Sequence, residues 1–147
     1  MSFPKNTVQA ELPDEYRQFE VLLEQQQLSF PKCVSCGRYH WYPRSVCPNC
    51  SAKQLVWKPA PATGRLFTWT VVHRKLDPEF SGATPYVVGL VEFEGVTGVR
   101  LVTNIIDTPL AALLIGLEVE PVFDTTPEGQ PIVHFKTVVK ALMATSS

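Results

Sequence analysis

The sequence lacks a hydrophobic run long enough to cross a membrane. Its longest apolar run, residues 110–117, is far shorter than the roughly 20 residues that a transmembrane helix needs. The first residues, Met1 to Lys5, are not followed by the apolar stretch of a signal peptide. We therefore expect a soluble cytoplasmic protein without a membrane partner. The 147 residues, of which 45% are hydrophobic and 18% charged, suffice for a real core.

The sequence also lacks the common signatures of catalysis. It contains no Gly-x-Ser-x-Gly elbow, no His-Glu-x-x-His pair, no phosphate-binding glycine loop and no dinucleotide fingerprint. The three histidines, His40, His73 and His134, are scattered, and we interpret them as surface or packed side chains rather than catalytic bases. We do not expect this chain to be catalytic by itself.

Acidic residues are absent from the middle of the chain. Residues 1–31 hold two basic and five acidic residues, and residues 76–147 hold three and nine. Residues 32–75 hold no acidic residue and eight basic ones: Lys32, Arg38, Arg44, Lys53, Lys58, Arg65, Arg74 and Lys75. Such a positive field favours a phosphate-bearing ligand, a nucleic acid or an acidic protein surface, or else it only complements the acidic remainder of the chain.

All four cysteines lie in this basic segment. They form two Cys-x-x-Cys pairs, Cys33 with Cys36 and Cys47 with Cys50, with ten residues between the pairs. Each pair can wrap a tetrahedral ion in a tight turn, here called a knuckle, and two knuckles complete a closed site. We predict a structural zinc, or iron in the same cage, and no cysteine left as a nucleophile. Two disulfides are disfavoured without a secretory signal, and a redox dithiol would need only one pair.

Apolar spacing predicts one amphipathic helix near the amino terminus. Residues 14–28 carry apolar side chains at spacings of three and four and begin after Pro13. The apolar stripe of this helix needs a partner surface, either the body of this chain or another subunit. The predicted division is a helical segment at residues 1–28, a zinc ribbon at 29–60 and a β domain at 61–147.

The β domain is predicted to contain five strands and one short helix. The strands are expected at Gly64 to Lys75, Tyr86 to Glu94, Gly98 to Ile106, Leu117 to Asp124 and Ile132 to Lys136. The turn signal from Glu94-Gly95 to Gly98 favours antiparallel pairing of the second and third strands. A helix is expected over residues 108–114, with a Thr108 cap, Pro109 at the first helical position and Gly116 as its stop.

Three strands, a helix and two strands form the order of an OB-fold barrel. A five-stranded sandwich or another small barrel is the alternative. The predicted fold class is therefore mainly β, with an N-terminal helix, a four-cysteine zinc ribbon and a five-stranded OB-fold barrel.

Several motifs occur together in the order of a known family. They are the N-terminal helix, Cys-x-x-Cys-Gly, Tyr42-Pro43-Arg44, Cys-Pro-x-Cys, Trp57, Gly64, Thr70 to His73, Pro85 to Val91 and Gly98 to Leu101. Over residues 14–136 the chain resembles the uncharacterised family that joins a rubredoxin-like zinc ribbon to an OB-fold and is associated with acyl-CoA. Ser51 in place of a glycine and the extra Val96-Thr97 are departures that concern loop geometry.

The resemblance implies a function that the residues alone do not. Family members accompany thiolases, thiolase-like aldolases or related condensing enzymes and lack evident catalytic residues. By this resemblance the chain is a zinc-containing, non-catalytic accessory subunit in a hetero-oligomer with a thiolase-like partner, and it assists acyl-CoA binding and assembly. The nucleophile would belong to the partner.

The basic segment offers residues for the phosphates of coenzyme A. Arg44, Arg65, Arg74 and Lys75 are the candidates, because charged side chains bind phosphate through charge-assisted hydrogen bonds. The aromatic run at residues 39–42 either stacks on adenine or packs on its own zinc knuckles.

Two other functions stay open at this point. A single-stranded nucleic-acid-binding zinc-ribbon/OB protein would use a positive groove and exposed aromatics, but the acidic charge of the expected barrel has the wrong sign. A pure assembly scaffold that touches no ligand is the third possibility.

Overall fold

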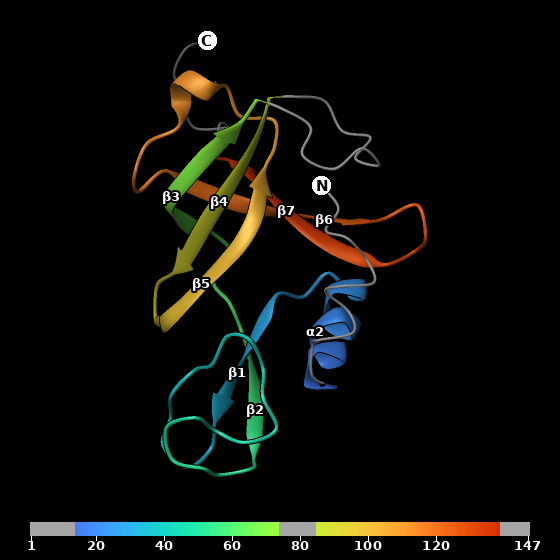
Figure 1. Cartoon of the computed structure of the whole chain (residues 1–147), viewed down its shortest axis with the longest axis vertical. Helices are drawn as coiled ribbons and strands as arrows, with labels where there is room; N and C mark the ends of the chain where they lie inside the picture. The colour runs from blue at the N-terminus through green and yellow to red at the C-terminus, as the bar shows by residue number, and fades with distance from the viewer. Residues whose placement is uncertain (1–13, 74–84, 139–147) are drawn as a thin grey trace.

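The computed structural model describes residues 14–73 and 85–138 (Figure 1). One helix, α2 (Glu15–Glu24), precedes a two-stranded ribbon made of β1 (Ser29–Cys33) and β2 (Leu55–Pro59). Five further strands follow: β3 (Gly64–Val72), β4 (Tyr86–Phe93), β5 (Val96–Ile105), β6 (Glu118–Thr125) and β7 (Pro131–Thr137). Within the described ranges no helix is long and apolar enough to cross a membrane.

The five later strands form a closed barrel in the order β3-β4-β5-β7-β6. β5 and β7 run parallel and join at one register pair, Ile105 with Phe135, whereas the other neighbours are antiparallel. The Thr103 hydroxyl strengthens this seam by donating to the Val133 carbonyl at 3.0 Å. A closed five-stranded barrel of this order confirms the predicted mainly β fold class with an OB-fold.

The hairpin between β4 and β5 confirms the predicted antiparallel pairing. Phe93 pairs with Val96 across a two-residue turn, and Gly95 adopts a φ of 78° there. β5 begins at Val96 rather than at the expected Gly98. The extra Val96-Thr97 therefore lengthens a strand, and Val96 is buried in the core because strand side chains alternate between the two faces.

The helix predicted over residues 108–114 is wrong in extent. The structure has only one 3-10 turn, η1 (Leu110–Ala112), and Pro109 lies just before it. The Thr108 hydroxyl does not cap this turn, because it donates to the Ile106 carbonyl at 2.8 Å and accepts the Thr137 N–H at 3.0 Å. The backbone that follows turns toward β3, where the Gly116 N–H donates to the Leu66 carbonyl at 2.8 Å, so helical bonds cannot continue.

Helix α2 ends at Glu24, four residues before the predicted end. Gln26 has a φ of 59°, and this left-handed conformation stops the helix. Phe19 and Leu23 are buried, and α2 packs against β7 and β1 (Figure 1). The apolar stripe therefore finds its partner surface within this chain.

Aromatic contacts join the ribbon, the helix and the barrel into one core. Phe30 of β1 is fully buried, and its ring centroid lies 5.3 Å from that of Phe93 in the barrel and 6.3 Å from that of Phe19 on α2. Phe93 in turn lies 5.9 Å from Phe135 of β7. The ribbon is thus anchored to the barrel by buried side chains, which fixes the position of its cysteines.

Candidate metal centre

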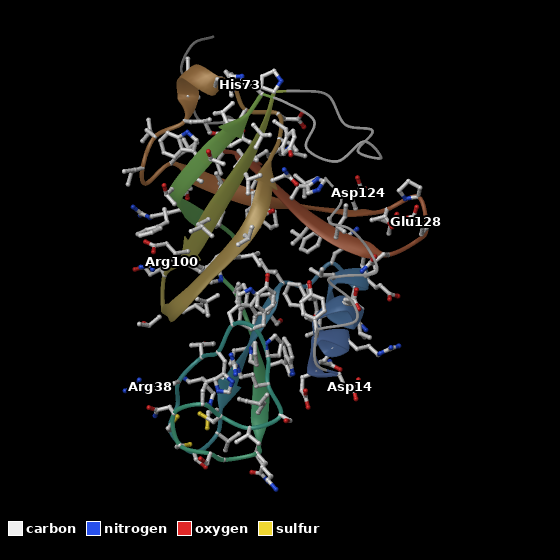
Figure 2. The ribbon with its side chains drawn as sticks, in the orientation of Figure 1. Asp14, Arg38, His73, Arg100, Asp124 and Glu128 are labelled. Carbon is white, nitrogen blue, oxygen red and sulfur yellow. The ribbon has the colours of Figure 1, made fainter. Side chains whose placement is uncertain are left out.

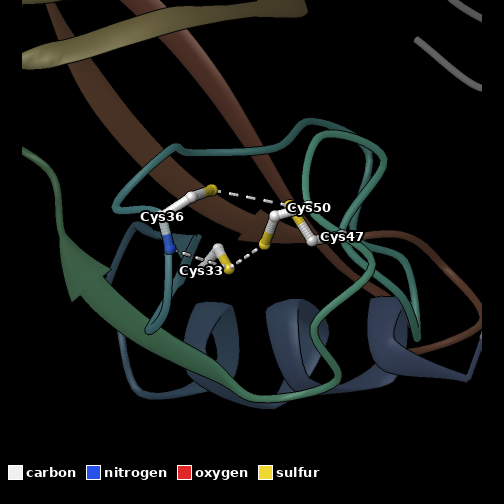
Figure 3. Close-up of side chains that lie close together, drawn as sticks. All are labelled: Cys33, Cys36, Cys47 and Cys50. Atoms are coloured by element: carbon white, nitrogen blue, oxygen red, sulfur yellow. Dashed lines mark hydrogen bonds between the residues drawn. The ribbon is translucent and has the colours of Figure 1, made fainter.

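The four cysteine sulfurs converge in the ribbon (Figure 3). The sulfur atoms, drawn in yellow, lie at the end of the ribbon away from the barrel (Figure 2). All four Sγ atoms lie within 4.8 Å of one another. Cys33 Sγ lies 3.5 Å from Cys50 Sγ, and Cys36 Sγ lies 3.7 Å from Cys47 Sγ. Each close contact joins the two knuckles, so the site needs both of them.

The two knuckles share one backbone geometry. The Gly37 N–H donates to the Cys33 carbonyl at 2.9 Å, and the Ser51 N–H donates to the Cys47 carbonyl at the same distance. Gly37 has a φ of 75° and Ser51 a φ of 66°, so the serine adopts the left-handed conformation that glycine takes in the first knuckle. The absence of a second glycine therefore leaves the turn unchanged.

Backbone N–H groups point at the sulfurs in both knuckles. The Cys36 N–H donates to Cys33 Sγ at 3.5 Å, and the Asn49 N–H donates to Cys47 Sγ at 3.4 Å. Cys33 and Cys47 are each 1% exposed. Donors aimed at a buried sulfur favour its thiolate form, which is the form that binds metal.

The sulfur cage fits zinc in size and chemistry. A tetrahedral zinc with Zn–S distances of about 2.3 Å separates its sulfurs by about 3.8 Å, close to the contacts in this site. The Arg38 backbone N–H lowers the pKa of Cys36 to about 6. The Ala52 backbone N–H lowers the pKa of Cys50, but the neighbouring Cys33 sulfur opposes it, and the net pKa rises to about 11. Because crowded sulfurs do not all ionise alone, a divalent cation is what stabilises four thiolates.

Two aromatic residues of the loop between the knuckles, Trp41 and Tyr42, contact aromatic residues of the helix and the ribbon. The centroid of the Trp41 ring lies 4.6 Å from that of Phe19 and 5.2 Å from that of Phe30. The Tyr42 ring stacks on Trp41 with a centroid distance of 4.9 Å. Trp41 thus packs into the shared core, whereas Tyr42 is 45% exposed. The Tyr42 ring therefore contacts Trp41, lies 6.0 Å from the Tyr16 ring and remains partly exposed to solvent.

His40, predicted to be a surface or packed side chain rather than a catalytic base, is buried in the ribbon. It is 6% exposed, and neither ring nitrogen has a hydrogen-bond partner among the described residues. Burial, followed by the charge of Arg44, lowers the pKa of His40. His73 follows β3 and His134 lies on β7, so the three histidines belong to separate elements. No sequence signal distinguishes a buried histidine from an exposed one in a loop of this composition.

The candidate coenzyme A residues do not share one element. Arg44 is exposed in the loop between β1 and β2, and Arg65 is exposed on β3. Arg65 stands in register with Glu92 of β4 and Glu118 of β6, which places a carboxylate-bearing residue on each side of it. Arg74 and Lys75 lie outside the described residues.

Two exposed valines beside the cysteines went unnoticed in the sequence. Val34 is 56% exposed and Val46 is 39% exposed. The available signal was their position, because an aliphatic residue inside or next to a knuckle has little core to enter.

Sequence profiles of two domains match most of this chain. The ChsH2 rubredoxin-like zinc ribbon domain matches residues 22–56, and the ChsH2 C-terminal OB-fold domain matches residues 57–124. A DUF35 domain-containing scaffold protein from Methanothermobacter thermautotrophicus is 36% identical over 97 residues, which cover 65% of this chain and 71% of that protein. The chain belongs to the DUF35 family. This confirms the predicted resemblance to proteins that join a rubredoxin-like zinc ribbon to an OB-fold.

Two further similar proteins are named for enzymes. The solved structure of the Ltp2-ChsH2(DUF35) aldolase is similar with 27% identity and a TM-score of 0.75, over 88% of this chain and 98% of that one. A probable enoyl-CoA hydratase alpha subunit from Thermomonospora curvata is 32% identical over 96 residues. That match covers 65% of this DUF35 chain but only 29% of the relative.

Proposed function

We propose that this chain is a zinc-containing, non-catalytic accessory subunit of a thiolase or thiolase-like enzyme, where it assists acyl-CoA binding and complex assembly. The observation that carries the proposal is the similarity to the chain of the Ltp2-ChsH2(DUF35) aldolase, which extends over 98% of that chain. The relative named as a scaffold protein supports a role in complex assembly. The relative named as a probable enoyl-CoA hydratase alpha subunit supports a partner that acts on acyl-CoA.

In this proposal Cys33, Cys36, Cys47 and Cys50 hold one zinc ion that serves structure only. Four protein sulfurs fill a tetrahedral shell, whereas catalytic zinc keeps one position for water or substrate. The four sulfurs lie within 4.8 Å of one another, so the cage is closed by the protein itself. The zinc supplies folding free energy to the ribbon.

The chemical step is assigned to the partner subunit. The metal site uses all four cysteines, so no thiol remains as a nucleophile. Among the described residues the histidines lie on separate elements, and no hydrogen bond joins a histidine to a nucleophile. What this chain contributes is binding and positioning.

Arg44 is the described residue best placed to help bind coenzyme A. It is exposed, it lies in the ribbon two residues after the 45% exposed Tyr42, and no carboxylate pairs with it among the residues that the structure describes. Arg65 is less suited to a phosphate because Glu92 and Glu118 flank it in register. Arg74 and Lys75 remain proposed contributors.

Co-purification followed by an activity assay tests the proposal. The tagged full chain should bring down a thiolase-like subunit, and acyl-CoA turnover should require both proteins. The isolated, zinc-loaded chain should show no turnover. Acyl-CoA turnover by the chain freed of its partner would contradict the proposed division of labour.

The coenzyme A role has its own test in the reconstituted complex. Arg44→Ala should raise the apparent KM for an acyl-CoA substrate about three- to tenfold, a modest effect because the side chain is exposed. Arg17→Ala, an exposed arginine on α2, is the matched control and should leave KM unchanged. An unchanged KM for Arg44→Ala, with normal assembly and zinc content, would remove Arg44 from the substrate site.

A further inference from the structure

Four exposed residues surround the metal site on the outside of the ribbon. Val34, Arg38, Val46 and Lys53 each lie within three residues of a site cysteine. Because the four sulfurs lie within 4.8 Å of one another, the backbone positions of these four residues are close together. We call the surface that Val34, Arg38, Val46 and Lys53 form the knuckle surface. Figure 2 shows Arg38 at the outer edge of the ribbon, remote from the barrel.

The two valines of the knuckle surface are left exposed by the rest of the described chain. Val34 and Val46 are 56% and 39% exposed, whereas the buried core cluster includes Phe30 of the ribbon and neither valine. Aliphatic side chains gain free energy only when another apolar surface covers them. A phosphate group or a nucleic-acid backbone offers no such surface, whereas a protein does.

The basic residues of the knuckle surface determine which charge a complementary partner surface carries. Arg38 and Lys53 form no ion pair among the described residues. Residues 32–60 hold five basic residues and no acidic one, and this excess outweighs the two net negative charges of a zinc bound by four thiolates. A protein surface that complements these residues is therefore acidic around an apolar centre.

The ribbon is also pre-organised for docking. Its anchor Phe30 is fully buried against Phe93 of the barrel and Phe19 of α2. Both knuckles are held by backbone hydrogen bonds of 2.9 Å. Little conformational freedom remains to be lost when a partner binds, which favours affinity.

We propose that the knuckle surface docks on an acidic surface with an apolar centre on the enzyme subunit that this chain accompanies. The proposal rests on the proposed function, because it names the surface that binds that partner. It assigns assembly to Val34, Arg38, Val46 and Lys53, and it leaves Arg44 to the substrate.

The test measures binding of the zinc-loaded full chain to the purified co-purifying subunit by calorimetry. Arg38→Glu combined with Lys53→Glu should weaken binding by at least about tenfold, and Val34→Asp by a similar factor. Val34→Ala is the milder variant and should give a smaller loss in the same direction. Arg17→Glu, the same charge reversal on α2, should bind as the unaltered chain does. Zinc content, measured for every variant, should stay at one per chain.

Each outcome separates the docking surface from the proposed function. Unchanged affinity in the double variant and in Val34→Asp would overturn the docking surface, although a thiolase-like partner would still support the proposed function. A co-purifying protein that does not act on acyl-CoA would overturn the proposed function, while the same titration would still decide the surface. Inorganic pyrophosphate could displace the partner from the unaltered chain but not from the Arg38→Glu, Lys53→Glu variant. That result would show a phosphate site at the knuckle surface and overturn the protein docking surface. Absence of any co-purifying protein would overturn both.

Discussion

The zinc ribbon and the barrel are stabilised in different ways. The barrel pairs five strands around buried side chains such as Leu66, Val91 and Phe135. The ribbon has two five-residue strands, and the segment between them is held by knuckle turns and by the sulfur cage. A barrel of this kind is stabilised by the burial of its apolar side chains, whereas a short ribbon depends on metal binding for its folding free energy. The two regions should therefore fail under different perturbations, except where Phe30 joins them.

The largest expected effect is the loss of the metal, which should disorder the ribbon and leave the barrel folded. Cys47→Ser replaces a buried sulfur ligand, and the variant should lose its zinc together with ribbon order. Structural zinc in comparable sites contributes an apparent binding free energy of roughly 10–16 kcal/mol, so its loss outweighs every other change considered. Metal analysis and amide NMR spectra should show a disordered ribbon beside barrel resonances that persist.

A neighbouring serine provides the control for this experiment. Ser35 is exposed between two site cysteines, so Ser35→Ala should keep one zinc per chain and an ordered ribbon. If Cys47→Ser kept both its zinc and its ribbon resonances, the metal would not be what orders this region.

The second effect acts on the contact that joins the regions. Phe30 is fully buried between Trp41, Phe19 and Phe93, so Phe30→Ala should leave a cavity shared by ribbon and barrel. We expect a loss of about 3–5 kcal/mol in the free energy of unfolding, measured by denaturant titration of the zinc-loaded protein.

An exposed phenylalanine shows whether burial is the cause. Phe67 is 38% exposed. The guanidinium carbon of Arg100 lies over one face of its ring, 3.9 Å from the ring centroid. Phe67→Ala should cost about 1 kcal/mol. Equal losses in the two variants would mean that the ribbon is not anchored through Phe30.

The third effect concerns pH and the ribbon. Burial and then Arg44 lower the pKa of His40, so the unfolded chain takes up a proton before the folded chain does. The stability linked to neutral His40 is complete above about pH 6.5 and is lost as the pH falls from there toward the folded-state pKa. His40→Gln should remove this part of the acid destabilisation, while His73→Gln, at an exposed position, should not. Identical stability-against-pH curves for the unaltered chain and His40→Gln would exclude the effect.

Local patterns in the sequence predict the framework of both regions. Spacing of the cysteines predicts the cage, and runs of β-branched residues predict all five barrel strands to within a few residues. These features depend on near neighbours in the chain. The hairpin is predicted for the same reason, because the turn signal from Glu94-Gly95 to Gly98 is local, although the second strand begins at Val96.

Long-range contacts explain what the sequence could not predict. Thr108 has the right composition for a helix cap, but its hydroxyl bridges Ile106 and Thr137, which lies far along the chain. Likewise, only strand register shows that Arg65 stands between Glu92 and Glu118, whose carboxylates contact Arg100 and Thr63 respectively. Neither the contact with Thr137 nor the strand register of Arg65 can be identified from the residues nearby in the chain.

The smallest expected effect compares the two knuckles with each other. Ser51 adopts a φ of 66°, which costs a residue with a side chain more than it costs glycine, and Gly37 fills the matching position at 75°. Ser51→Gly should relieve that strain, but glycine also gains freedom in the unfolded chain, so the net gain in stability should not exceed about 1 kcal/mol. The reciprocal change, Gly37→Ser, should cost about 1 kcal/mol, and both shifts can be followed by thermal unfolding of the zinc-loaded chain. Destabilisation by Ser51→Gly would indicate that the serine side chain makes a contribution beyond its backbone conformation, and the two knuckles would then differ in more than the residue that closes the turn.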